Sequence, residues 1–578
     1  MISGRLPLVL LAVVAASCGG REPPEQPAGG DSGTATEAPA AVAAVLEAGD
    51  AAAAAIAAED IRAAVAELGD DRYEGRAPGT PGDELTQRYL TAALEALGFE
   101  PAFPNRSYRQ PFELVGVSAA QPSVWTFATA GGAALELAQG ADFIAASGVE
   151  RERAAIDGAE VVFVGYGIEA PEHDWDDFKG ADLAGKVLLM LNNDPDWDPE
   201  LFGGVERLYY GRWTYKYESA ARQGAAGAII VHTTPSAGYP WQVVQSSWSG
   251  TQFRLPASGA PEIEVQAWVT DEAARRVTAL GGHDLDALVE QARSRDFRPV
   301  PLGVTTSIVL ENTLSRVETA NVAGVLRGRD PQLADELVVY TAHHDHLGVG
   351  EPNPSGDPND RIYNGARDNA SGVGMVLAIG RAFRALPEPP RRSVMLLFVG
   401  AEEQGLLGAL HFAANPPVPP GRIAANVNYD SGNIWGETRD ITFIGLGKSS
   451  LDDVAAAIAR REGRIVVGDQ FPDRGLYYRS DQFAFAQIGV PAFYFSPGTD
   501  FVGRPEGWGR EQAERYTNLH YHQPSDELGP EWSFAGMVQD ARFGFLAGLL
   551  IAEADELPRW RPGDEFEAAR ERALEALR

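Results

Sequence analysis

Apolar runs and helical patterns alternate along the chain from about residue 304 onward. Helical periodicity marks residues 371–386 and 451–463, and the apolar runs between such segments end in polar residues. Apolar runs that alternate with helices are typical of a mostly parallel sheet covered on both faces. We therefore expect an α/β fold, with a mixed, mostly parallel sheet flanked by helices. Its strands are predicted at 336–345, 393–400, 426–430 and 491–498.

The pattern before residue 304 differs in its two parts. Helical patterns near 61–68 and 83–97 match the later α/β segments, whereas about 110–300 holds short apolar runs separated by turn residues. We therefore expect one α/β domain made of residues 58–110 and 304–578. It is interrupted by an inserted β-rich domain over residues 111–303.

The amino terminus has the pattern of an export signal. Residues 1–18 contain one Arg, a short apolar run and small residues leading to Cys18, which is similar to a bacterial lipoprotein signal with Cys18 as the lipidated residue. A plain secretory signal with an incidental Cys is the alternative. Residues 19–57, rich in Gly, Pro, Glu and Ala, are predicted to be a flexible tether whose Ala-rich end could become helical. We expect an exported bacterial protein, anchored by lipid to the outer membrane and facing the periplasm.

Length and charge narrow the classes of function. The chain has 578 residues, enough for several domains, and a formal net charge of −33. Such an acidic surface repels phosphate backbones, so we expect no nucleic-acid partner. No other run of 18 apolar residues occurs, so we expect membrane contact only through the lipid anchor. Cys18 is the only cysteine, which excludes an intrachain disulfide and a cysteine zinc site.

Imidazole and carboxylate side chains gather where the predicted strands end. Charged groups at the ends of buried parallel strands are costly unless something compensates them, and a divalent metal is the simplest compensator. Histidine and carboxylate ligands suit Zn²⁺, with Mn²⁺ and Co²⁺ as alternatives, and two such ions would share one carboxylate. The residues concerned are His343, His344, Asp345, His346, Asp368, Glu402, Glu403, Asp430, His522 and Asp526.

Five motifs in order give the chain a family resemblance. It resembles the secreted co-catalytic dizinc aminopeptidases of metallopeptidase clan MH, family 28, over about 60–110 and 304–555. Many relatives carry an inserted protease-associated domain at the position that residues 111–303 occupy here. Residues 216–232 resemble the core of that domain. The motifs are His343-x-Asp345, Asp368-Asn-Ala-Ser-Gly372, Glu402-Glu403, the strand-end Asp430 and His522-x-Pro-x-Asp526.

The resemblance implies a role for each matched position. Two Zn²⁺ ions per chain would be bridged by Asp368, with His343 and Asp430 completing one site and Glu403 and His522 the other. Glu402 would be the general base, Asp345 would orient His343, and Tyr521 would help stabilise the oxyanion. Where the family often has Ser-Asp-His, this chain has Gln482, so no role is assigned to that position.

Each motif alone also has an ordinary structural interpretation. Glu402 and Glu403 could begin a solvated helix, and Asp368 could cap the helix that follows it. Because alternate residues on a strand face opposite ways, His343 and Asp345 are expected on one side and His344 on the other. His344 and His346 are predicted to support the site or face substrate and not to bind metal.

The expected function is hydrolysis of peptide bonds by a zinc exopeptidase, with aminopeptidase action preferred. The alternatives are a glutamate-carboxypeptidase-like or dipeptidase activity, a glutaminyl-cyclase-like acyltransferase, and a non-enzymatic binding protein. Peptides are the expected substrates. The sequence leaves side-chain preference and oligomeric state open.

Overall fold

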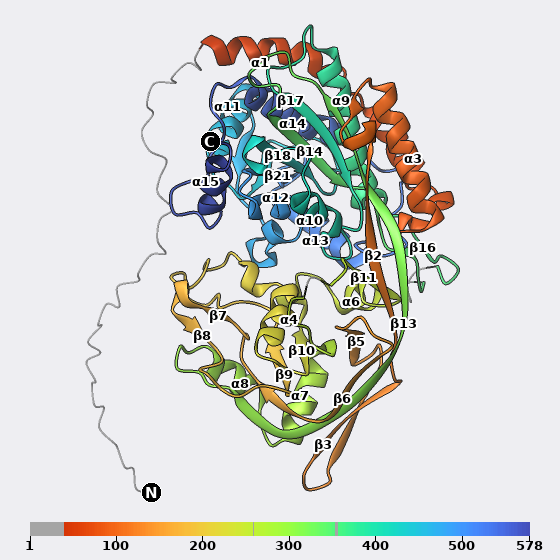
Figure 1. Ribbon diagram of the computed structural model, residues 1–578, viewed down its shortest axis with the longest axis vertical. Helices are drawn as coiled ribbons and strands as arrows, with labels where there is room; N and C mark the ends of the chain where they lie inside the picture. The colour runs from red at the N-terminus through yellow and green to blue at the C-terminus, as the bar shows by residue number, and fades with distance from the viewer. Residues whose placement is uncertain (1–39, 258, 353–356) are drawn as a thin grey trace, which may run out of the picture.

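The computed structural model describes residues 40–578 except 258 and 353–356. The signal predicted at 1–18, its Cys18 and residues 19–39 of the predicted tether lie outside the described residues. Figure 1 shows two bodies, one above the other. We call residues 40–108 and 319–578 the α/β body and residues 121–311 the insert body.

The sheet of the α/β body is mixed and mostly parallel, as predicted. Its central strand β14 (Leu337–His343) pairs in parallel with β17 (Ser393–Val399) on one side and β18 (Ile423–Tyr429) on the other. Strand β21 (Ala492–Pro497) continues the parallel order beyond β18, and β19 (Asp440–Ile444) then pairs antiparallel with β21. The short strand β20 (Ile465–Val467) lies beside β19. Four parallel neighbours thus bring their carboxyl ends to one edge.

Helices cover both faces of this sheet, and β14 shows why. Val338, Tyr340 and Ala342 are buried in one core, while Leu337 and Val339 are buried in another on the opposite face. The first core includes α1 (Ala40–Ala53), α2 (Ala58–Leu68), α3 (Pro81–Ala96), α9 (Gly372–Ala385), α11 (Leu451–Glu462) and α14 (Ala535–Glu553). The second core includes α10 (Leu407–Ala414) and α12 (Gln482–Gln487), while α13 (Trp508–Leu519) and α15 (Glu567–Glu575) lie outside both.

Helix α14 is a core helix of this fold. Within the described residues it is the one helix long and apolar enough to cross a membrane, and 78% of its apolar window is buried inside the protein. Packing against α1, α9 and the sheet accounts for its composition.

The Ala-rich end of the segment predicted as a tether is helical and docked over residues 40–53. These residues form α1, which packs against α14. Leu46, Ala52, Ala53 and the following Ile56 are buried in the first core. Alanine has the highest helix propensity, and a few apolar contacts suffice to dock such a helix.

The insert body has its own sheet and its own cores. Strand β10 (Gly227–His232) lies between β9 (Val187–Leu191) and β12 (Val265–Thr270), all parallel, and β6 (Arg153–Phe163) extends the sheet beyond β9. The remaining strands are β3 (Val124–Thr129), β4 (Ala134–Ala138), β5 (Phe143–Ser147), β7 (Glu169–Ala170) and β8 (Trp175–Asp176). The helices are α4 (Trp213–Arg222), α5 (Thr234–Ala237), α6 (Trp241–Ser247), α7 (Asp271–Leu280) and α8 (Leu285–Ala292).

One long strand, β13 (Val300–Leu326), joins the two bodies and runs along the right edge of Figure 1. It pairs with β6 and β3 in the insert body, then with β2 (Arg109–Ala120), and finally with β17. Burial alternates from residue 302 to 312, whereas residues 319–324 are all buried. The domain boundary predicted between 303 and 304 therefore falls inside a continuous strand. Strands β1 (Glu100–Pro101) and β11 (Thr251–Arg254) pair with β13 and β2, while β15 (Gly348–Val349) and β16 (Ile362–Tyr363) pair with each other.

Candidate active site

The carboxyl edge of the parallel strands brings the predicted site residues together. His343 is the last residue of β14, Asp430 follows β18, and Glu402 and Glu403 lie three and four residues after β17. Asp368 lies in the irregular turn Ala366–Ser371 that precedes α9. Loops at this edge of an open α/β sheet form its usual ligand crevice.

His343 lies at the centre of a first group of carboxylates. Its Nε2 atom is 3.2 Å from Asp368 Oδ1, 3.4 Å from Asp430 Oδ1 and 3.9 Å from Glu402 Oε2. The His343 side chain is 1% exposed, whereas those of Glu402 and Asp430 are 11% and 16% exposed, so the imidazole is buried and the two carboxylates keep some access to solvent.

His522 lies in a second group on the other side of Asp368. Its Nε2 atom is 3.0 Å from Glu403 Oε2 and 3.5 Å from Asp368 Oδ2. The two carboxylate oxygens of Asp368 therefore face different histidines. His346, for which no metal role is predicted, has its Nδ1 atom 2.5 Å from Glu403 Oε1.

These donor atoms fit divalent cations. His343, Asp368 and Asp430 offer one nitrogen and two oxygens within 4.8 Å of one another, and so do His346, Asp368 and Glu403. The Nε2 atom of His343 is buried and has no hydrogen-bond partner among the described residues. A buried, unpaired imidazole nitrogen directed at carboxylates is what a metal ligand requires.

The same crowding shifts the pKa values of the site. Burial by itself lowers the pKa of His343, but Glu402, Asp368 and Asp430 outweigh it and raise that pKa well above its usual value. In the same way Glu403 and Asp368 raise the pKa of His522 to about 9 against the effect of burial. Burial, reinforced by Glu403, raises the pKa of Glu402 well above that of an ordinary carboxyl. The cluster holds an excess of negative charge that a cation would relieve.

Asp345 supports the site differently from the prediction. Its carboxylate accepts hydrogen bonds from the backbone N–H groups of Glu402, at 3.0 Å, and Glu403, at 3.3 Å. Toward His343 Nδ1 it presents its backbone oxygen at 3.3 Å, with the carboxylate farther away at 3.9 Å. Asp345 therefore positions the Glu402–Glu403 segment at least as directly as it orients His343.

Asp526 and Arg76 position the loops around Asp368, and the sequence analysis assigned neither a role. The Asp526 carboxylate accepts the backbone N–H of Asp368 at 3.0 Å. The buried Arg76 guanidinium donates to the backbone oxygens of His344 and Gly365, among others. The signals were the last Asp of the His522 motif and the conspicuous Glu-Gly-Arg segment at 74–76.

His344 and Gln482 lie away from the metal-type donors. His344 Nε2 is 3.4 Å from Asp83 Oδ1, on the opposite side of β14 from His343, as the alternation predicts. The buried Gln482 side chain accepts from Asn428 Nδ2 at 3.0 Å and donates to the Tyr477 carbonyl at 2.6 Å. Gln482 thus ties strand β18 to the segment before α12.

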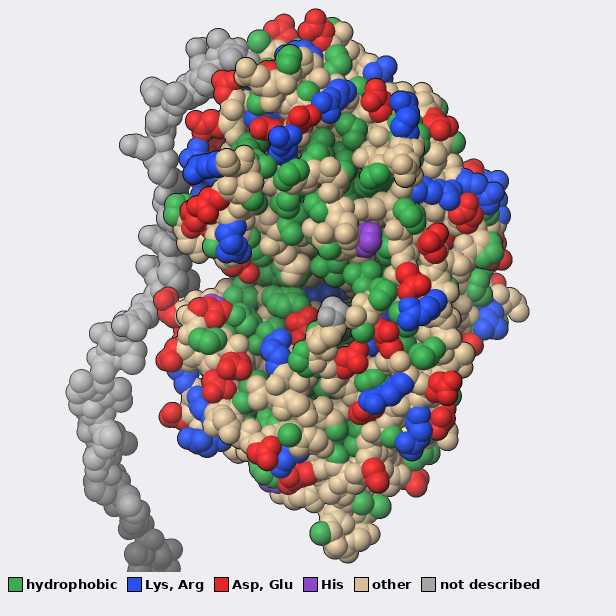
Figure 2. Space-filling model, in the orientation of Figure 1, with side chains coloured by type: hydrophobic (Ala, Val, Ile, Leu, Met, Phe, Trp, Pro, Cys, Tyr) green, Lys and Arg blue, Asp and Glu red, His purple; other side chains and the backbone are tan. Residues whose placement is uncertain are grey.

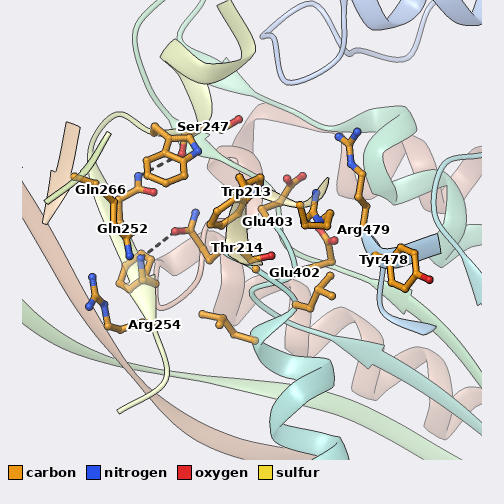
Figure 3. A pocket seen from close by; sticks show the side chains of 18 of the residues that line it. Trp213, Thr214, Ser247, Gln252, Arg254, Gln266, Glu402, Glu403, Tyr478 and Arg479 are labelled. Carbon is orange, nitrogen blue, oxygen red and sulfur yellow. Dashed lines mark hydrogen bonds between the residues drawn. The ribbon is translucent and has the colours of Figure 1, made fainter. Parts of the chain in front are cut away.

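A cavity of about 460 Å³ lies above the cluster, between the two bodies. Figure 2 shows the surface hollowed where they meet. Figure 3 shows Glu402 and Glu403 between Arg479 and Tyr478 on one side and the insert residues Gln252 and Gln266 on the other.

Tyr521 and His522 line this cavity together. The Tyr521 ring stacks on the His522 ring at 3.9 Å, and its hydroxyl accepts a 3.4 Å hydrogen bond from Arg479 Nη2. Burial raises the pKa of Tyr521 well above that of an ordinary tyrosine, so the hydroxyl stays protonated and able to donate.

The insert body touches the cluster directly through Ser247. The Ser247 hydroxyl, at the end of α6, lies 2.8 Å from His522 Nδ1. A second contact joins the backbone N–H of Phe253 to Gln404 Oε1 at 3.0 Å, next to Glu403. Ser247 precedes His522 by 275 residues, and no motif marks it, so the sequence offered no signal for this contact.

Comparisons with known proteins show what this chain is similar to. The model of peptidase family M28 matches residues 321–544. Aminopeptidase NAALADL1 of Mus musculus is 24% identical over 297 residues, which cover 43% of this chain and only 35% of that relative's length. A solved aminopeptidase from Aneurinibacillus sp. strain AM-1 has a similar fold, with a TM-score of 0.51, 19% identity, and coverage of 88% of this chain and 97% of that one. BSAP, a zinc aminopeptidase from Bacillus subtilis, aligns with a TM-score of 0.45 and 18% identity over 85% of this chain and 94% of its own.

Proposed function

We propose that this chain is a zinc-dependent aminopeptidase of peptidase family M28, the family whose model matches residues 321–544. The observation that carries the proposal is the convergence of His343, Asp368, Glu403, Asp430 and His522 below one cavity, with Glu402 beside them. The family match and the aminopeptidase relative support it.

The five converging residues are proposed to hold two zinc ions. Asp368 would be shared, because its two oxygens face His343 on one side and His522 on the other. Asp430 would complete the first set and Glu403 the second. Zinc ions bound there would supply Lewis acidity, which activates water and polarises a carbonyl.

Glu402 is proposed to move the proton. It carries the raised pKa of a general acid–base group and lines the cavity next to the donors. The carboxylate takes a proton from the attacking water and delivers it to the departing amine. The Tyr521 hydroxyl, held beside His522, donates a hydrogen bond to the oxygen of the tetrahedral centre.

We extend the proposal to the parts of the chain around this site. The insert body is proposed to be a protease-associated domain that roofs the cavity and limits the substrates to short or unfolded peptides. Export and lipidation at Cys18 are proposed from the sequence pattern alone. Peptides are the proposed partners.

A peptide pool analysed by mass spectrometry tests the proposal. Protein lacking residues 1–20 is incubated with mixed peptides, with and without a chelator, and the Glu402→Gln variant serves as the matched control. We expect loss of single amino-terminal residues, absent with chelator and with Glu402→Gln. Carboxyl-terminal trimming would favour the carboxypeptidase alternative. Cyclisation of amino-terminal Gln without cleavage would favour the cyclase, and no change after zinc is restored would refute a peptidase.

A further inference from the structure

The two histidines proposed as zinc ligands are supported by different parts of the molecule. The Nδ1 atom of His343 is 3.3 Å from the backbone oxygen of Asp345, in the α/β body. The Nδ1 atom of His522 is 2.8 Å from the hydroxyl oxygen of Ser247, in the insert body. A histidine that binds metal through Nε2 carries its proton on Nδ1, so each Nδ1–H donates to the oxygen beside it. One imidazole is therefore oriented from within its own body and the other from the opposite body.

Hydrogen bonds hold helix α6, which ends at Ser247, against the α/β body. Near the start of the helix, Gln242 Nε2 donates to the backbone oxygen of Asn518 at 2.9 Å, four residues before His522. At its end, the backbone oxygen of Ser247 accepts a 3.3 Å hydrogen bond from Gln252, in strand β11, and β11 pairs with β2. The position of the Ser247 hydroxyl therefore depends on how the insert body packs against the α/β body.

The segment that carries Glu403 also contacts the insert body. Gln404 Oε1 accepts the backbone N–H of Phe253, in β11, at 3.0 Å. Glu403 and His522 both line the cavity between the two bodies, and Glu403 Oε2 is 3.0 Å from His522 Nε2. We call Glu403 and His522 the second set. Both of its members thus lie next to contacts made by the insert body.

The first set, His343 and Asp430, is supported from inside the α/β body. Ser431, directly after Asp430, donates its backbone N–H to Asn369 Oδ1 at 3.0 Å. The His343 side chain is buried, and its Nδ1 atom faces the backbone oxygen of Asp345. These contacts join residues of one body, so a movement of the insert body would leave them in place.

We propose that the insert body selectively holds one of the two zinc ions, because Ser247 positions His522 for the second set. The inference rests on the proposed function, and it assigns Ser247 as a positioning residue for one ion of the proposed site. The hydroxyl fixes the His522 ring with Nε2 directed at Glu403 and Asp368. When the insert body moves away, the ring loses this acceptor and the second set binds its ion less tightly, whereas the first set is unaffected. Opening of the cavity and retention of the second ion are therefore coupled.

Counting zinc ions on the intact protein provides the first test. Purified, zinc-loaded protein is titrated with a chelator, and native mass spectrometry counts the ions per chain at each concentration. In Ser247→Ala we expect the dissociation constant of one ion to rise about 10- to 100-fold, the usual cost of losing such a support, and that of the other to stay within about threefold. Ser247→Thr keeps the hydroxyl and should retain both ions as the unaltered protein does.

The matched control is Ser246→Ala. The Ser246 hydroxyl donates to the backbone oxygens of Gln242 and Val243 within α6. Its loss alters the same helix without touching His522, so zinc binding should be unchanged. Circular dichroism and melting temperatures check that each variant is folded.

Two backgrounds identify which ion responds. Asp430→Asn weakens the first set, and Glu403→Gln weakens the second. Adding Ser247→Ala to Asp430→Asn should weaken the remaining ion about tenfold or more, whereas adding it to Glu403→Gln should change the remaining ion by less than about threefold. A general structural defect caused by Ser247→Ala would instead weaken the remaining ion in both backgrounds, and that result would overturn the positioning role.

The outcomes separate this inference from the proposed function. Equal weakening of both ions in Ser247→Ala, or of neither, would overturn the selective role of the insert body, while release of amino-terminal residues by the same protein would still uphold the aminopeptidase. Selective weakening of one ion in a protein that cleaves no peptide would support the positioning role and refute the aminopeptidase. A protein that binds fewer than two zinc ions would overturn this inference, and one that binds none would also refute a zinc-dependent enzyme.

Discussion

The floor and the roof of the cavity are built from opposite kinds of side chain. The floor, at the strand ends of the α/β body, concentrates carboxylates and imidazoles around Asp368. The roof, from the insert body, presents Trp213, Tyr239, Trp248 and the amide of Gln252. The floor has the donors for metal chemistry, whereas the roof has aromatic and amide groups of the kind that line ligand pockets.

The contrast is not complete, because residues of the insert body also contact or approach residues of the floor. Ser247 lies beside His522 Nδ1, and Arg212 from the roof shares the cavity with Arg479 from the floor. The difference therefore suggests a division of labour in which the floor performs chemistry and the roof controls geometry and choice of substrate. Four experiments test that division, from the largest expected effect to the smallest.

Metal removal should have the largest effect and should act on the floor alone. Dialysis against a chelator is expected to abolish peptide cleavage, and added Zn²⁺ is expected to restore it, because the carboxylates need a cation to act together. Activity is followed with Ala-Ala-amide, and metal content by elemental analysis. Full activity in metal-free protein would contradict the assignment of the floor.

Glu402→Gln should remove chemistry and leave the metal in place. We expect kcat to fall by about 10² to 10⁴-fold, the range for loss of a general acid–base group, because the amide cannot accept the proton. Zinc content should equal that of the unaltered protein, since Glu402 is not among the proposed ligands. A variant that keeps normal turnover would remove Glu402 from the mechanism.

Ser247→Ala asks how far the roof influences the floor. The hydroxyl holds His522 Nδ1 at 2.8 Å, and loss of such support typically costs about 10- to 100-fold in metal affinity or activity. We expect weaker zinc retention in competition with a chelator. Ser249→Ala, at an exposed position two residues away, is the matched control. Identical zinc affinity in the two variants would show that the contact between Ser247 and His522 does not influence metal binding.

The smallest effect concerns acid stability of the roof. Burial lowers the pKa of His232, in strand β10, to about 4 from its ordinary 6.5. The unfolded chain therefore takes up the proton first, so stability is full above about pH 6.5 and falls as the pH drops toward 4, by up to about 3 kcal/mol. In His232→Gln this loss should be smaller. Melting temperatures of both proteins between pH 4 and 7 measure it, and parallel curves would rule out His232 as the cause.

Most of the α/β body could be predicted from the sequence. Its strands are continuous apolar runs, and its polar residues stand where those runs stop, so the floor residues could be named before their positions were known. The docking of helix α1 was not predicted, because its alanines carry little hydrophobic signal and the contacts include only a few larger residues, Leu46 in the helix and Ile56 after it. The predicted domain boundary divided strand β13, because burial alternates along its first half and is continuous near its end. In the structure it is one strand that pairs with β6 in the insert body and with β17 in the α/β body.

The sequence by itself determined the fold class and the chemical content of the floor, because both depend on local pattern and on motifs within single loops. Only the tertiary structure decided that Ser247 meets His522, that Asp345 holds the backbone of Glu402 and Glu403, and that Arg212 and Arg479 share one cavity. These contacts join residues tens to hundreds of positions apart. They depend on how the insert body packs against the α/β body, and no periodic pattern in the sequence predicts that packing.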